Sequence, residues 1–177
     1  MRESQLLSHI YTRSRDLSAR FPYILAGPGH DCASIKTPAT SLLKVDQLVE
    51  RRHFAPETPL DLIARKAIAR AVSDIAASGG TPLASLAAAT LPPSYAHADE
   101  LFDRLSHWAI HFNCPLVGGD IATARDTTSP LTLSISITAT PHPSRGHVLR
   151  STAQPGDSLY TTGSIGGSLN PDGGGGG

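Results

Sequence analysis

Residues 59–79, PLDLIARKAIARAVSDIAASG, decide the fold of this chain. The stretch carries apolar side chains at every third or fourth position, which stack on one face of a helix with about 3.6 residues per turn. Thr58 is the expected N-cap, Pro59 suits the first helical position, and Gly79 can end the helix in the left-handed conformation. The stretch therefore predicts an amphipathic helix with one face on a core. Its apolar positions are Leu60, Ile63, Ala64, Ala67, Ile68, Ala71, Val72, Ile75 and Ala76.

Asp74 is the unusual residue of this helix. On a helical projection it falls between Ile63 and Ala67, inside the apolar stripe, whereas Arg65, Lys66, Arg70 and Ser73 fall outside it, where solvent is expected. A buried carboxylate without a partner costs several kcal/mol, so Asp74 is expected to have one. Two interpretations stay open on the residues alone. Asp74 is either a capped or ion-paired structural residue, or a metal ligand or catalytic base.

The composition limits the class of protein. The chain has 177 residues, enough for one ordinary domain, and it is 40% hydrophobic. Its 15 basic and 15 acidic side chains cancel, so no overall charge points to nucleic acid or to a membrane surface. No apolar run approaches the roughly 20 residues of a membrane span, and the polar N-terminus lacks a signal-peptide core. Cys32 and Cys114 are predicted to be free thiols, and the expected location is the cytoplasm.

The remaining pattern predicts alternating helices and strands. Residues 81–92 fit a strand or a helix, and their shortness and flanking prolines favour a strand. In the segment from Cys114, a short buried strand is expected to run into a Gly-Gly-Asp turn at 118–120. The Gly-rich end, 171–177, is interpreted as a linker or a cut end. The other expectations are helices at 3–18 and 96–113, a buried strand at 41–49, a strand at 131–139 with one face buried and the other polar, and a strand with a Gly-rich turn within 157–168.

Four aspartates occur in similar contexts. Asp31 follows a Gly turn, Asp46 ends a strand, Asp74 lies on the helix, and Asp120 belongs to Gly-Gly-Asp. Carboxylate oxygens are hard ligands that suit magnesium, and several of them in one pocket would repel one another unless cations were bound. Each aspartate alone would be interpreted as a turn or cap residue. Only convergence in space would make them a metal site.

Nucleotide-binding signals are mixed. The backbone amides of Gly118 and Gly119 could approach a phosphate, and Ser164–Ser168 could form a second anion-binding turn. The P-loop pattern GxxxxGK[ST] is absent, as is a GxGxxG after a strand, which excludes a P-loop kinase. No nucleophile elbow occurs, so no catalytic nucleophile is expected. His53 is interpreted either as a surface histidine or as a substrate contact.

Five motifs in a fixed order resemble the N-terminal half of the thiamine-monophosphate kinase family. They are GPGHDCASI (27–35), LLKVDQLVERRHF (42–54), ARKAIARAVSDIAASGGTPLA (64–84), PLVGGDIAT (115–123) and LRSTAQPGDSLYTTGSIGGS (149–168). That family belongs to the superfamily of aminoimidazole ribonucleotide synthetase, selenophosphate synthetase and the hydrogenase maturation protein HypE. The resemblance covers roughly residues 20–170.

The resemblance implies ATP-dependent phosphorylation of thiamine monophosphate to the diphosphate, by direct in-line transfer with several Mg²⁺ ions. Asp31, Asp46, Asp74 and Asp120 match the magnesium ligands of the family. Gly119, Asp120 and Arg150 match its ATP contacts, and His53 matches a contact to the thiamine phosphate. This agrees with the chemistry, because phosphoryl transfer needs charge neutralisation and alignment more than a covalent nucleophile.

The implied fold is a PurM-like α/β (α+β) domain, with helices packed on one face of a mixed sheet that pairs into a barrel across a homodimer. Residues 1–20 would be an N-terminal helix, 21–170 the ATP- and magnesium-binding domain, and 171–177 the tail, with the family's C-terminal domain absent.

This chain departs from the family pattern at several places. Gly29-His30-Asp31 replaces Gly-Asp-Asp, Lys44-Val45-Asp46 replaces Ser-Thr-Asp, and Gly-Gly-Asp is followed by Ile-Ala rather than Thr-Thr. The asparagine usual near Asp74 is missing from residues 69–72. Two alternatives therefore stay open: a superfamily member that acts on another small substrate, and a non-catalytic nucleotide-binding or dimerisation module.

Overall fold

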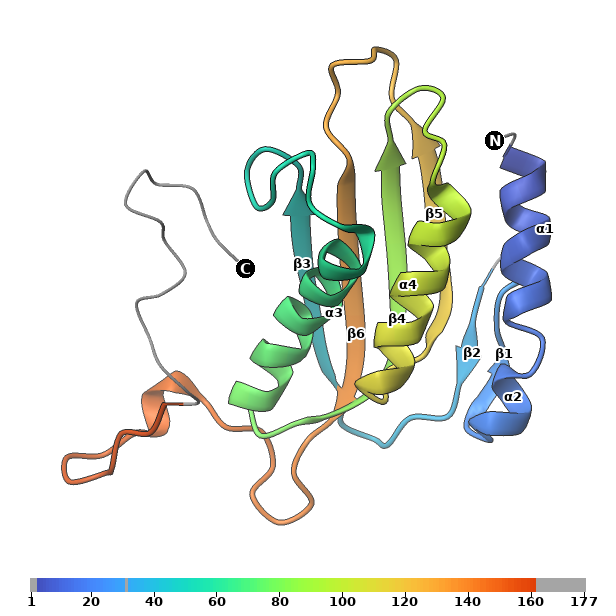
Figure 1. Cartoon of the computed structure of the whole chain (residues 1–177). Helices are drawn as coiled ribbons and strands as arrows, with labels where there is room; N and C mark the ends of the chain where they lie inside the picture. The colour runs from blue at the N-terminus through green and yellow to red at the C-terminus, as the bar shows by residue number, and fades with distance from the viewer. Residues whose placement is uncertain (1–2, 31, 162–177) are drawn as a thin grey trace.

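The computed structural model describes residues 3–30 and 32–161, and a four-stranded sheet forms its centre (Figure 1). β4 and β5 run parallel, whereas β6 is antiparallel to both β3 and β4. The sheet is therefore mixed, as predicted, and β3 and β5 are its two edges. The strands lie in the order β3 (Leu42–Val49), β6 (Thr132–Thr140), β4 (Thr81–Leu91) and β5 (Leu116–Thr123).

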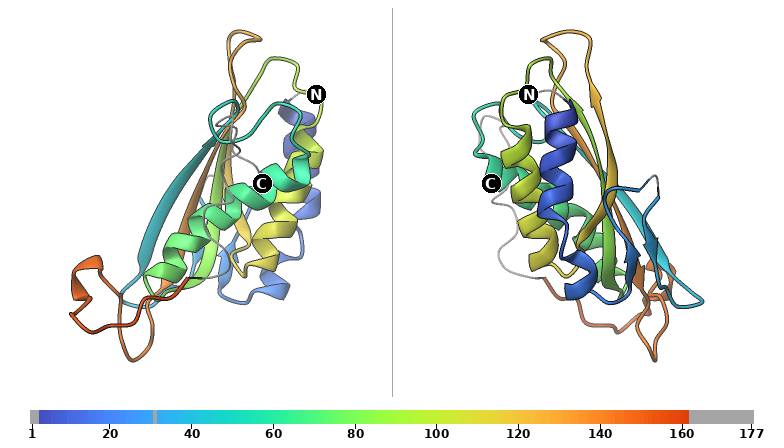
Figure 2. Two further views of the ribbon diagram at one scale, coloured as in Figure 1. Left: turned by 60° about the vertical axis from the view of Figure 1, so that its left-hand side comes forward. Right: turned by 90° about the vertical axis from the view of Figure 1, so that its right-hand side faces the viewer.

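The long helices lie on one side of this sheet (Figure 2). Helices α3 (Leu60–Ala77) and α4 (Ala98–His111) pack on the sheet, and α1 (Glu3–Arg13) packs on α4. Over β3 and β6 the other face carries no helix in the described part of the chain. We call this the open face. Leu43 and Val45 of β3 are 80% and 60% exposed on it, and Leu86 of β4, the strand next to β6, extends it and is 43% exposed. One-sided helix packing was predicted, and the fold confirms it.

The core lies between the sheet and the two helices. On the central strand β6, Leu133, Ile135 and Ile137 are at most 1% exposed and alternate with half-buried Thr and Ser, as the predicted strand at 131–139 requires. From α3, Ala64, Ile68 and Ala71 are fully buried against this face, so most of the predicted apolar stripe is confirmed. Burial of this continuous apolar surface is the main stabilising contribution to the domain.

Three predicted elements differ in the structure. The helix expected at 3–18 breaks into α1 and the short α2 (Leu17–Arg20), because Leu6 joins the main core whereas Leu17 joins a second cluster with Ile24 and Val117. Residues 157–161 form no strand, since no described strand pairs with them, and Leu159 is 98% exposed. The expected cap Thr58 also makes no capping hydrogen bond, because α3 begins one residue later, after Pro59.

The Gly-Gly-Asp segment is not a turn but part of the edge strand β5. Gly119 pairs with Ala87 on β4, and a Cβ at Gly119 would lie 1.9 Å from the Ala87 carbonyl oxygen. No larger residue fits without moving one of the two strands. Gly119 therefore permits close approach of β5 to β4, next to an irregularity in the register at Ser85 and Leu86.

The smaller elements complete the fold. Strands β1 (Ile24–Ala26) and β2 (Ser34–Ile35) form a separate antiparallel pair, and η1 (Arg150–Thr152) follows the loop after β6. Both cysteines are free, as predicted. Among the described residues no helix is long and apolar enough to cross a membrane. Asp31, the turn at 164–168 and the tail at 171–177 lie outside the described residues.

Candidate functional site

Four charged side chains meet between the edge strand β3 and helix α3. Alternation along β3 points Lys44 and Asp46 toward α3, where they meet Arg70 and Asp74, which are spaced one helical turn apart. Lys44 Nζ lies 2.6 Å from Asp74 Oδ2 and 3.5 Å from Asp46 Oδ2. Arg70 Nη2 lies 3.4 Å from Asp46 Oδ1. We call these four residues the β3–α3 cluster.

The prediction that Asp74 is buried is wrong, although the expectation of a partner is confirmed. The Asp74 side chain is 56% exposed, because it lies on the flank of the apolar stripe at the sheet edge, where no further strand covers it. The ammonium of Lys44 donates to this carboxylate and holds its pKa below the usual range. The same hydrogen bond raises the pKa of Lys44. Both groups are therefore charged near neutral pH.

Arg70 was expected to face solvent, and the structure corrects this as well. Its side chain is 38% exposed, but its Nε is buried and has no hydrogen-bond partner. The cation therefore leans over β3 rather than out into water. The sequence spacing is compatible with such a cluster, since Arg70 and Asp74 are four residues apart on a helix and Lys44 and Asp46 share one face of a strand.

His53 lies in the turn that follows β3, within the electrostatic influence of Arg70 of the same cluster. Its Nδ1 accepts a hydrogen bond from the Val49 N–H at 2.9 Å, in a turn where Arg51 has a φ of 63°. Burial, together with the nearby Arg70 and Arg52 cations, lowers the pKa of His53. The imidazole is therefore neutral at pH 7, with its proton on Nε2, and can donate one hydrogen bond to a bound group.

Arg150 belongs to this side of the molecule. It lines a hollow of about 450 Å³ together with Lys44, Asp74 and Ser78, between β3, the end of α3 and η1. The structure thus brings Asp46, Asp74, His53 and Arg150 to the β3 edge of the sheet.

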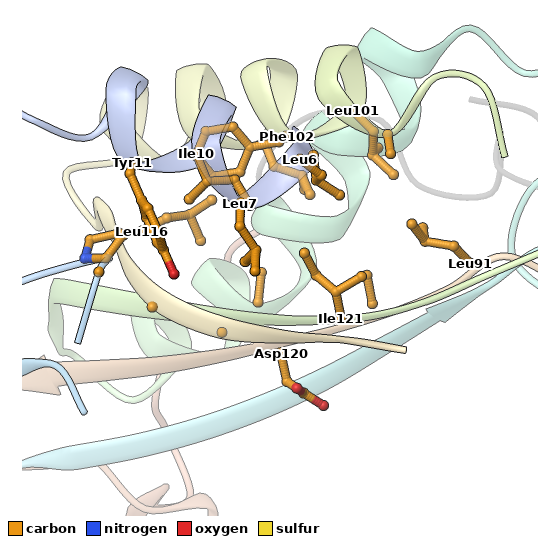
Figure 3. Close-up of a pocket in the computed structure, with 18 of the residues that line it drawn as sticks. Leu6, Leu7, Ile10, Tyr11, Leu91, Leu101, Phe102, Leu116, Asp120 and Ile121 are labelled. Atoms are coloured by element: carbon orange, nitrogen blue, oxygen red, sulfur yellow. The ribbon is translucent and has the colours of Figure 1, made fainter. Parts of the chain in front are cut away.

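A second, apolar cavity of about 210 Å³ lies at the opposite edge, over β5. Gly118, Gly119 and Ile121 of β5 form its floor. Side chains of α1 and α4 form its walls (Figure 3). We call it the β5 cavity. Leu7, Ile10 and Tyr11 reach down from α1, and Ile121 points up toward them (Figure 3). Its apolar wall residues are Leu6, Leu7, Ile10, Tyr11, Leu101, Phe102 and Leu105.

One carboxylate of α4 links two side chains of the wall helix α1. Asp103 accepts hydrogen bonds from His9 Nε2 at 3.0 Å and from Arg13 Nε at 3.1 Å. No motif in the sequence marks α1 as part of a site. The only signal was its apolar stripe, which on sequence alone is indistinguishable from ordinary core packing.

The predicted magnesium ligands do not all come together in the described residues. Asp120 is exposed, pairs with Ala88 in the register, and points away from the β5 cavity (Figure 3). It therefore lies on the sheet face opposite to Asp46, at the other edge. Three strand spacings separate β3 from β5, about 14 Å. Within residues 3–30 and 32–161, no three Asp, Glu, His or Cys side chains are grouped so that they could hold a metal ion.

The surroundings of the Asp46–Asp74 pair decide whether it can hold magnesium. Magnesium needs oxygen ligands with open positions for water or phosphate oxygens. Here Lys44 contacts both carboxylates and Arg70 contacts one of them, so the pair is already neutralised. As arranged in this structure, the pair does not fit a divalent cation.

Comparison with known proteins places this chain in a family. Residues 29–140 match the family described as AIR synthase related protein, N-terminal domain. The chain is 36% identical over 172 residues to a thiamine-monophosphate kinase of Escherichia coli, covering 93% of this chain and 49% of that enzyme. It spans about half the length of the curated relatives it matches.

Solved structures agree with this match. The crystal structure of thiamine-monophosphate kinase from Stenotrophomonas maltophilia K279a is similar at a TM-score of 0.62 and 26% identity, over 74% of this chain and 41% of that one. AaThiL complexed with AMPPCP and TMP shares the fold, with a TM-score of 0.51 and 23% identity over 78% of this chain and 43% of that one.

Proposed function

The chain belongs to the AIR synthase related protein family, and from this membership we propose that it is the nucleotide-binding half of a thiamine-monophosphate kinase. The proposed reaction is ATP-dependent phosphorylation of thiamine monophosphate to thiamine diphosphate, by direct in-line transfer. Relatives with that name, 33% and 36% identical over more than nine-tenths of this chain, support the proposal. The complex of AaThiL with AMPPCP, an ATP analogue, and TMP supports the proposal that ATP and thiamine monophosphate are the two substrates.

The β5 cavity is the observation that carries the nucleotide proposal. Its volume of about 210 Å³ is below the ~300–1,000 Å³ of drug-sized ligand sites, which suits one flat ring system with the rest of the ligand outside. Its walls are apolar, and its floor is the backbone of Gly118 and Gly119. We assign it to the adenine ring, with the backbone of Gly119 and of Asp120 as contacts, while the Asp120 carboxylate points to the other face of the sheet. Because Ala87 lies too close for a side chain at position 119, Gly119 carries none, and its backbone stays accessible to the ligand.

The β3 edge would then receive the phosphate groups. Arg150 and Lys44 line one hollow, and Lys44, Arg65, Lys66 and Arg70 line its neighbour on the other side of the Lys44–Asp74 pair. Such cations stabilise the charge on a transferring phosphoryl group. His53 is the proposed contact to the thiamine phosphate, because its neutral ring can donate from Nε2. We thus predict that Arg150 contacts the phosphates of ATP and that His53 contacts the phosphate of thiamine monophosphate.

Magnesium is the cofactor that the resemblance implies, and when bound it would neutralise phosphate charge. Because the Asp46–Asp74 pair does not fit a divalent cation, no step is assigned to a metal there. Asp31 and Asp120 stay predicted magnesium ligands.

A homodimer is part of the proposal. In one copy, strand β5 with Gly119 and Asp120 lies about 14 Å from strand β3 with Asp46. Two copies joined through their sheets offer a second way to bring such groups together. The apolar side chains Leu43, Val45 and Leu86 on the open face support this mode of pairing. The cancelling charges point to no nucleic-acid or membrane partner, and we propose a cytoplasmic location.

Filling the β5 cavity tests the nucleotide proposal. Ala89 lines the cavity, so Ala89→Leu is expected to weaken AMPPCP binding by at least about tenfold in calorimetry, since the added side chain takes the place of the ring. Ala122→Leu, at an exposed position of the neighbouring strand β5, is the control and should bind as the unsubstituted chain does. Equal weakening in both variants, or none in Ala89→Leu, would refute the assignment.

The kinase activity is tested separately. Purified chain incubated with ATP, magnesium and thiamine monophosphate is expected to yield thiamine diphosphate, measured by chromatography. Nucleotide binding without product favours the alternative of a non-catalytic nucleotide-binding or dimerisation module. The specific observation behind that alternative is the 2.6 Å contact of Lys44 with Asp74, which ties up a predicted metal ligand. Product from another small acceptor instead of thiamine monophosphate would favour a different superfamily member.

A further inference from the structure

Lys44 is the centre of the β3–α3 cluster. Its ammonium reaches Asp74 of helix α3 at 2.6 Å and Asp46 of its own strand at 3.5 Å. The lysine side chain is 27% exposed and that of Asp46 is 21% exposed, so both are largely withdrawn from solvent. Two carboxylates from different elements thus meet on one cation.

The charges of the cluster balance. Two carboxylates that face each other repel, and a protein holds them together with a metal ion or with a basic side chain. Lys44 contacts both acids, and Arg70 takes the second oxygen of Asp46, so two positive charges match two negative ones. The lysine ammonium is a compact point charge with three donors, which allows it to serve two carboxylates at once.

A divalent cation would have to displace this ammonium. A Mg²⁺ ion bound to Asp46 and Asp74 would need their oxygen atoms, and the nearby ammonium and guanidinium groups would repel it. The negative charges of both carboxylates are already balanced by Lys44 and Arg70.

We propose that Lys44 is the resident cation of the Asp46–Asp74 pair and takes the place of a divalent metal ion there. This pair consequently binds no Mg²⁺ or Mn²⁺ in the native chain, and a neutral side chain at position 44 opens a divalent-cation site. The inference goes beyond the proposed function and does not depend on it, because it concerns cations in the absence of nucleotide.

The test is Mn²⁺ binding to the full chain without nucleotide, followed by the electron paramagnetic resonance signal of free Mn²⁺. Lys44→Ser is expected to bind Mn²⁺ at least about tenfold more tightly than the unsubstituted chain, because a positive charge beside both carboxylates is removed. Mg²⁺ should compete for the new site. Lys44→Arg, which keeps the charge, and Lys36→Ser, which removes an exposed lysine elsewhere, should both behave as the unsubstituted chain does.

A second substitution locates the new site. Adding Asp74→Asn to Lys44→Ser should abolish the gain, since one of the two carboxylates is then lost. A folded Lys44→Ser variant, checked by circular dichroism, that gains no Mn²⁺ affinity would overturn the proposal.

The unsubstituted chain decides the matter if Lys44→Ser does not fold. Asp74→Asn in the otherwise native chain should leave Mn²⁺ affinity unchanged, because Asp74 holds no divalent ion. A tenfold or larger loss of Mn²⁺ affinity in Asp74→Asn would show that the pair binds metal with Lys44 present, and the proposal would then be wrong.

Discussion

The two edge strands of the sheet, β3 and β5, differ in what lies between them and the helices. At the β5 edge, Gly119 lets the backbone approach β4 closely, and an apolar cavity lies under α1. At the β3 edge, Lys44 and Asp46 fill the corresponding space under α3 with charged side chains that neutralise one another. One edge is shaped by missing side chains and the other by paired ones.

This difference predicts different sensitivities. Backbone approach at the β5 edge allows no side chain to adjust, so small changes there should be costly. At the β3 edge the Lys44–Asp74 pair is more than half exposed on its acidic side and is screened by water, so its loss should cost little stability even where binding properties change. Three substitutions test this contrast, in decreasing order of expected effect.

Gly119→Ala should be the most damaging. Its Cβ would lie 1.9 Å from the Ala87 carbonyl oxygen, which is backbone and cannot rotate away. We expect a loss of about 3 kcal/mol in the free energy of unfolding, measured by urea denaturation with Trp108 fluorescence. Gly118→Ala is the matched control, because its Cβ would meet no backbone atom within 4 Å but the flexible Leu86 side chain at 3.2 Å and the Ala33 Cβ at 3.8 Å. Equal losses in the two variants would contradict the backbone argument.

Asp103→Ala should have an intermediate effect at the β5 edge. It removes the acceptor for both His9 and Arg13, and we expect a loss of about 1 kcal/mol because the carboxylate is 34% exposed. Amide hydrogen exchange should quicken in α1 but not in α3, since α1 loses its attachment to α4. Asp99→Ala, at the start of α4, is the control and should leave exchange in α1 unchanged. Unaltered exchange in Asp103→Ala would mean that apolar packing alone holds α1.

Asp74→Asn should have the smallest effect on stability. The pair it breaks is more than half exposed on the acidic side, so about 0.5 kcal/mol is expected at pH 7, with less in high salt. A loss above 2 kcal/mol at pH 7 would show that the β3 edge is not screened as argued.

The pH dependence of that small effect follows from the direction of the two pKa shifts. The folded-state pKa of Asp74 is lowered, so its contribution is present above the unfolded value of about 3.9 and is lost as the pH falls through the folded value. The pKa of Lys44 is raised, so its contribution is present below about 10.5 and is lost as the pH rises through the folded value. The difference between the native chain and Asp74→Asn in urea midpoints should therefore vanish in strong acid.

Local periodicity was enough to predict most elements. The helix at 59–79 and the strand at 131–139 follow from apolar spacing, because each buries one continuous face. The Gly-Gly-Asp segment was misread as a turn because glycine serves both turns and close strand approach, and only the neighbouring strand distinguishes the two uses. The strand expected after Asp157 failed for a related reason, since a strand needs a partner that its own sequence does not provide.

By itself the sequence determined the element types, the family resemblance and the identity of the candidate residues, since these depend on side chains near one another along the chain. Only the tertiary structure decided which of those residues meet. The strand order β3-β6-β4-β5 puts Asp46 and Asp120 on opposite edges and opposite faces, and it brings Lys44 against Asp74 across thirty residues of chain. Strand order comes from long-range burial of the whole apolar face, and no local pattern records it.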